Sequence, residues 1–137
     1  MSPRTREQRR ALHAYECVEA VPPKQRADYK ARVHGLGGAV LRDGLAAALT
    51  FLERECQDNE AVELLLGDLA GYLSAAELPE LETAREGRRL PAAVRGLSLE
   101  AYMLATREVL RLLVWFRRAV QATFTEREGA GDAERPA

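Results

Sequence analysis

Residues 98–124 constrain the fold more than any other segment, because their apolar spacing is that of one long amphipathic helix. The sequence SLEAYMLATREVLRLLVWFRRAVQATF contains no glycine or proline that would interrupt it. Apolar side chains cover most of its circumference, which predicts a helix at the centre of its domain. Ser98 is the predicted N-cap, and Glu100 falls in the first turn, where the helix dipole favours an acidic side chain.

The polar face of this helix is narrow, and its charges are almost all arginine. At about 100° per residue, Arg107, Arg111 and Arg118 project within about 40° of one another. Such a stripe is more often a solvated helix face than a binding site. Because the guanidinium group is well suited to phosphate, the stripe is nevertheless the best functional candidate in the sequence.

Length and composition predict one domain with a substantial core. The chain has 137 residues, of which 47% are hydrophobic and 30% charged. We predict a single helical domain over residues 1–127 and a disordered tail over residues 128–137, which has nothing to bury. The polar N-terminal segment resembles neither a signal peptide nor a membrane anchor, and Cys17 and Cys56 fit reduced thiols, so we expect a cytoplasmic protein.

The rest of the chain has helical periodicity and no convincing strand alternation. The sequence therefore predicts an all-α fold, a compact bundle of about five to six helices with a long C-terminal helix. Predicted helices span residues 6–20, about 24 to a break at the glycines of 35–38, 39–56, 60–76 and a short stretch at 80–86. Thr5 with Gln8 forms a predicted capping box, and Asp58 or Asn59 caps the fourth helix. Predicted core positions include Leu12, Leu41 and Phe51.

Charge is distributed unevenly along the chain, although the net charge is only −1. Residues 43–86 carry eleven acidic side chains and only Arg54 and Arg85 as bases. Both flanking regions are basic, so terminal helices could offer a face to phosphates while the acidic middle meets a basic partner or another copy. Lys24 and Lys30 are the only lysines among twenty basic residues, a bias that GC-rich genome composition also produces.

Residue patterns for catalysis or metal binding are weak. His13 and Cys17 stand four apart on one helix face, but no second pair has metal-ligand spacing, and two partly buried side chains are the favoured interpretation. His34 precedes a glycine and is predicted in a surface turn. The acidic residues between 53 and 63 fit a solvated face better than a calcium loop. We therefore expect no enzymatic activity, no cofactor and no metal.

Three blocks of sequence resemble a known family, the small helical subunit of the Cmr effector complex of type III-B CRISPR systems. They are QRRALHAY at 8–15, Tyr29-Lys30 with DGLAAALTFL at 43–52, and YMLATREVL at 102–110 followed by WFRRA at 115–119. Each block alone is ordinary amphipathic helix, so the specificity lies in the combination. The chain departs from the family pattern after Leu36, where a proline is expected, and over residues 77–97.

The resemblance implies a non-catalytic part of a crRNA-guided, RNA-targeting complex in antiviral defence. Such subunits stack in several copies beside the backbone subunits and flank the channel in which target RNA pairs with the guide. Its implied partners are other Cmr subunits, copies of itself, and guide and target RNA, with no membrane. The basic residues expected to contact RNA are Arg107, Arg111, Arg118, Arg117, Lys30, Arg9 and Arg10.

Two other functions stay open. The same bundle could be a protein-interaction adaptor, with its arginines pairing the acidic surface of a partner and no direct nucleic-acid contact. An enzyme using His13, Cys17 and the acidic cluster is the least favoured of the three.

Overall fold

The computed structural model describes residues 3–124, and every regular element within that range is helical. The predicted tail at residues 128–137 lies outside the described residues. The elements are α1 (Arg6–Glu19), η1 (Pro23–Gln25), α2 (Arg26–Asp43), α3 (Leu45–Glu55), α4 (Glu60–Ala75), η2 (Gly87–Arg89), α5 (Leu90–Arg95) and α6 (Leu99–Thr123). The predicted all-α bundle with a long C-terminal helix is thus confirmed.

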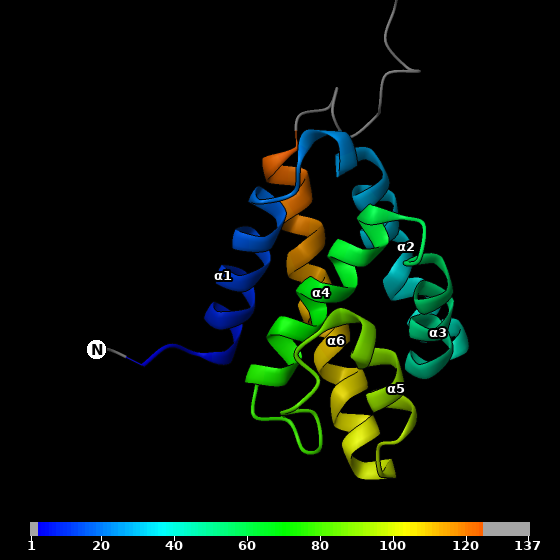
Figure 1. The fold of residues 1–137 in the computed structure, drawn as a ribbon. Coiled ribbons are helices and arrows are strands. Elements are labelled where there is room, and N and C mark those ends of the chain that lie inside the picture. Colours follow the sequence, from blue (N-terminus) through cyan, green and yellow to red (C-terminus); the bar gives the residue numbers. More distant parts are fainter. Residues whose placement is uncertain (1–2, 125–137) are drawn as a thin grey trace, which may run out of the picture.

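Helix α6 occupies the middle of the bundle, with α1 on one side and α2 on the other, and α4 crosses in front of it (Figure 1). Its 25 residues give a length of about 37 Å at 1.5 Å per residue. One connected core joins all six α-helices, and Tyr29, Phe116 and Leu65 are among its largest fully buried side chains. Within residues 3–124, no helix combines the length and the apolar character that crossing a bilayer requires.

The helix starts follow the sequence signals closely. Thr5 and Gln8 form the predicted reciprocal capping box of α1. The side chain of Asn59 accepts a hydrogen bond from the Val62 amide at 3.1 Å and caps α4. Ser98 caps α6, as predicted. Helix α3 has no side-chain cap of its own, and the Ala46 amide instead donates to the Tyr102 hydroxyl of α6 at 3.0 Å.

The glycines at 35–38 do not end the helix, so this part of the prediction is wrong. Helix α2 continues through them to Asp43, because Val33, Leu36 and Val40 bury a continuous face that outweighs the low helix propensity of glycine. The break lies at Gly44, whose φ of +95° is a conformation that favours glycine. His34 consequently lies inside α2 and not in a surface turn.

Two further expectations fail. Residues 80–86 form turns, and the helical structure of this connector comes later, in η2 and α5, where Pro91 stands in the first turn. Leu12, Leu41 and Phe51 are exposed and lie outside the core. Amphipathic spacing alone placed them on the apolar face, whereas the neighbouring helices cover only part of that face.

Gly87 allows η2 to pack directly on the backbone of α4. A Cβ atom at this position would lie 2.6 Å from the Gly67 nitrogen and 2.8 Å from the Leu66 carbonyl carbon. We expect Gly87→Ala to lower the free energy of unfolding by about 1–3 kcal/mol, since backbone cannot yield as a flexible side chain does. Gly38→Ala is the control, because its Cβ would meet nothing within 4 Å and should stabilise α2 by about 0.5–1 kcal/mol. Urea unfolding of both variants tests this, and equal stability of Gly87→Ala and the parent chain would contradict it.

Candidate nucleic-acid interface

One exposed stripe runs along the length of α6. Its residues recur every three or four positions, the spacing of one helix face, and comprise Glu100, Met103, Arg107, Arg111, Val114, Arg118 and Gln121. Arg107, Arg111 and Arg118, which we call the arginine row, are all exposed. Eleven residues separate the ends of the row, which places them about 17 Å apart along the axis at 1.5 Å per residue.

The arginine row carries charge that the described part of the chain does not neutralise. Among residues 3–124, no carboxylate lies within ion-pair distance of any of its three guanidinium groups, whereas Arg32, Arg88 and Arg95 each have a carboxylate partner. The guanidinium carbon of Arg118 lies 4.8 Å from the centre of the Trp115 ring, a contact that leaves its charge intact. The row is therefore a line of positive charge facing solvent.

Two apolar side chains lie on the same stripe as the row, Met103 before Arg107 and Val114 between Arg111 and Arg118. Met103 is 62% exposed and Val114 is 44% exposed. The face is thus a mixed surface, able to contact apolar groups as well as anions.

Lys30 and Arg117 lie beside the row, on the side toward α2. Arg117 is exposed, and Lys30 is half-buried on α2. Burial, followed by the positive charges of Arg117 and Lys30, lowers the pKa of His34, a half-buried residue one turn after Lys30. Both cations therefore disfavour protonation of the same imidazole, Lys30 from α2 and Arg117 from α6.

Arg10 does not belong to the exposed basic surface, which corrects the prediction for this residue. It is 7% exposed, and its Nε and Nη2 donate to the two carboxylate oxygens of Glu108 at 2.6 and 3.0 Å. The Tyr72 hydroxyl donates to the same carboxylate at 3.0 Å. Burial opposes ionisation of Glu108, but the hydrogen bonds from Arg10 and Tyr72 prevail and lower its pKa. Arg10 is thus a structural side chain that joins α1 to α6.

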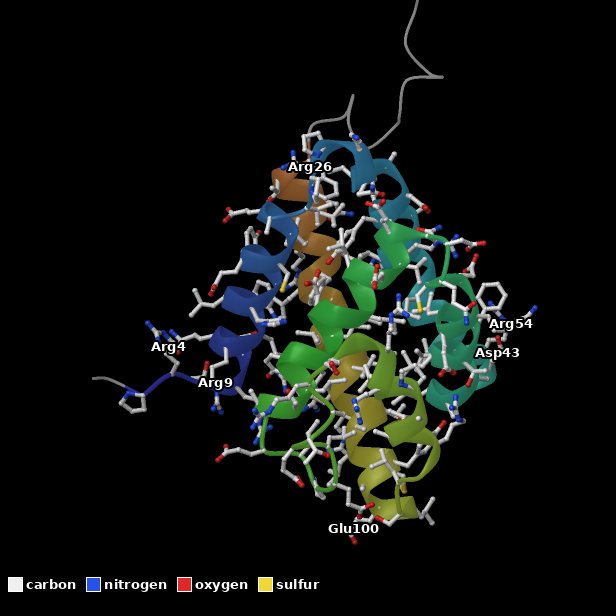
Figure 2. The ribbon with its side chains drawn as sticks, viewed as in Figure 1. Arg4, Arg9, Arg26, Asp43, Arg54 and Glu100 are labelled. Atoms are coloured by element: carbon white, nitrogen blue, oxygen red, sulfur yellow. The ribbon has the colours of Figure 1, made fainter. Side chains whose placement is uncertain are left out.

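Arg9 is exposed on α1 and not on the helix that carries the arginine row. With Arg4 and Leu12 it lines a hollow of about 240 Å³ whose described lining comes from α1, the segment before it and the end of α4. Figure 2 shows Arg4 and Arg9 together near the N-terminal end of α1, at the outer edge of the molecule. The structure thus separates the seven predicted contact residues into the arginine row, Lys30 with Arg117, the buried Arg10, and Arg9 on the exposed side of α1.

His13 and Cys17 belong to a hydrogen-bonded cluster between α1, α2 and α4. His13 Nε2 lies 2.7 Å from the Asp68 carbonyl oxygen and 3.3 Å from Cys17 Sγ. The Tyr29 hydroxyl donates to the Asp68 carboxylate at 2.6 Å. Burial, together with Asp68, raises the pKa of the Cys17 thiol and keeps it protonated, which suits packing and not nucleophilic chemistry. Among residues 3–124, no group of three or more His, Cys, Asp or Glu side chains is placed to hold a metal ion.

The chain matches one protein family along almost all of its described length. The family model described as "CRISPR-associated protein (Cas_Cmr5)" matches residues 6–123. The protein "CRISPR system Cmr subunit Cmr5" of Thermus thermophilus is 38% identical over 125 residues, which cover 90% of this chain and 99% of that protein. The crystal structure of a CRISPR-associated Cmr5 family protein from Thermus thermophilus matches with a TM-score of 0.72 at 34% identity, covering 89% of this chain and 100% of that one.

Proposed function

The chain belongs to the Cmr5 family of CRISPR-associated proteins, and we propose that it is a non-catalytic structural subunit of a type III-B Cmr complex. That complex is crRNA-guided, targets RNA and acts in antiviral defence. In it the arginine row lines the channel that holds guide and target RNA. The observation that carries the proposal is the exposure of three aligned guanidinium groups without carboxylate partners in residues 3–124.

Contacts of this kind neutralise phosphates and carry no base information. A helix that presents arginine at spacings of four and seven residues can follow a strand without reading its sequence. RNA binding through the row is therefore sensitive to salt and nearly independent of sequence, as a complex whose specificity comes from guide pairing requires.

Several copies stack head to tail along the complex in this proposal. Exposed acidic side chains gather at the start of α4, where Asp58, Glu60 and Glu63 lie, while Arg4 and Arg9 stand at the start of α1. Unlike charges on different surfaces favour a heterologous contact between copies, and such contacts extend into rows of subunits.

An adaptor function is the second candidate, and the exposure of Met103 and Val114 favours it. Apolar side chains inside a basic stripe could pack against another protein whose acidic groups pair with the arginines. In that case α6 would hold the subunit in place and make no contact with RNA.

Replacing Arg107, Arg111 and Arg118 with glutamine separates the two functions, because glutamine keeps helix propensity and removes the charge. RNA contact predicts that the variant still assembles with the other subunits while the complex retains less RNA. The adaptor function predicts that the variant is lost from the complex. Exchange of Arg54, Arg85 and Arg89 for glutamine is the matched control, since it removes equal charge from exposed residues outside α6 and outside the proposed contact between copies.

A further inference from the structure

His34 has an unsatisfied polar atom on the α2 side of the arginine row. The residue is half-buried, and its Nε2 atom is covered and has no hydrogen-bond partner in the described part of the chain. Buried polar atoms in native proteins nearly always have a partner, so an orphaned one calls for an explanation. The terminal torsion of a histidine side chain is soft, so a half-buried ring can turn Nε2 toward a ligand at small cost.

The charges around this ring are positive. Lys30 lies four residues earlier on the same face of α2, and Arg117 lies on α6, which packs against α2. These are the charged groups on the two helices that act on His34, and both disfavour its protonation. A bound anion would offset the positive charges of Lys30 and Arg117, which keep the imidazole of His34 neutral.

We propose that Lys30, His34 and Arg117 form a seat for one phosphate group of the RNA backbone, beside the arginine row. The seat rests on the proposed function, since the RNA that follows the row would supply the phosphate. Lys30 and Arg117 provide the charge, and the imidazole donates a hydrogen bond to a phosphate oxygen. The bound phosphate offsets the repulsion from both cations, and His34 takes up a proton as the phosphate binds.

Proton uptake makes the strength of binding depend on pH. His34 is neutral in the free protein near neutral pH, whereas the phosphate-bound form favours the imidazolium. Affinity for RNA therefore rises as the pH falls through the range in which His34 titrates. If the phosphate raises the pKa of His34 by about one unit, affinity at low pH increases up to about tenfold.

The test measures RNA retention by the reconstituted Cmr complex, using the full chain and a labelled guide-matched RNA, between about pH 8 and about pH 5.5, which brackets the ordinary histidine pKa of about 6.5. We expect about three- to tenfold tighter retention at the lower pH in the parent complex. In the His34→Gln complex this ratio should fall to about one. The arginine-row variant should bind less at both pH values and keep the ratio.

The outcomes separate the two proposals. A His34→Gln complex with the parental pH ratio, alongside a row variant that loses RNA, overturns the seat and leaves the proposed function standing. If the row variant also retains RNA normally, the proposed function fails as well.

A second measurement covers the case in which His34→Gln folds poorly. In the isolated chain, an NMR titration should show a higher His34 pKa in Arg117→Gln than in Arg54→Gln, and an equal pKa in the two would overturn the seat.

Discussion

Replacing Arg10 with methionine while Glu108 is kept is expected to destabilise the chain by about 3–5 kcal/mol. The substitution leaves the Glu108 carboxylate buried at the contact of α1, α4 and α6. Within residues 3–124, the Tyr72 hydroxyl and the more distant Arg6 are then its remaining polar partners. The Arg6 Nη1 atom lies 3.9 Å from that carboxylate, too far for a hydrogen bond. Urea unfolding followed by circular dichroism measures the loss.

The matched control removes the whole network with Arg10→Met, Glu108→Leu and Tyr72→Phe. Because no charge is then left buried, this variant should recover most of the lost stability.

The pH dependence has a definite sign. The lowered pKa of Glu108 contributes stability that is present above its unfolded pKa and is lost as the pH falls through the folded value. The difference in free energy of unfolding between the parent chain and Arg10→Met should therefore become smaller in acid. A difference below about 1 kcal/mol at neutral pH would contradict the structural role of the Arg10–Glu108 pair.

The arginine-row variant is expected to lose about ten- to hundredfold in RNA affinity when it is measured inside the complex. We assign about 0.5–1 kcal/mol to each exposed guanidinium–phosphate contact, and three contacts act together. The dependence on salt gives a second readout. Each contact with a single strand contributes about 0.7 to the slope of log affinity against log salt, so the slope should become shallower by about 2.

The control with Arg54, Arg85 and Arg89 replaced tests whether general charge explains the effect. It lowers the positive charge equally, so a loss of affinity equal to that of the row variant would show long-range attraction and no contact at α6. A changed affinity with an unchanged salt slope would contradict phosphate contact by the row.

Local signals in the sequence predicted much of the fold. The capping box at Thr5 and the caps at Asn59 and Ser98 depend on neighbours within one turn, so sequence spacing was sufficient to find them. The glycines of α2 misled the prediction because tertiary burial of Val33, Leu36 and Val40 decides that helix. The actual break lies at Gly44, whose φ of +95° favours glycine.

The candidate site was predictable only in part. Helical geometry placed Arg107, Arg111 and Arg118 on one face correctly, because all three belong to one helix. The prediction for Arg10 failed because its partner, Glu108, lies 98 residues away in the sequence and no local pattern connects the two. His34 was predicted in a surface turn, because the helix was expected to end at the glycines, so its spacing of four residues from Lys30 on one helix was not considered.

The central claim is that the arginine row faces RNA inside a Cmr complex, and site-specific photocrosslinking tests it most directly. A photoreactive phenylalanine derivative in place of Arg111 would be incorporated into the reconstituted complex with labelled guide and target RNA. Leu41, exposed on α2, provides the control position. We predict crosslinks to RNA from position 111 and none from position 41. Crosslinks from position 111 to protein subunits alone would contradict the RNA-lining role and establish the adaptor function instead.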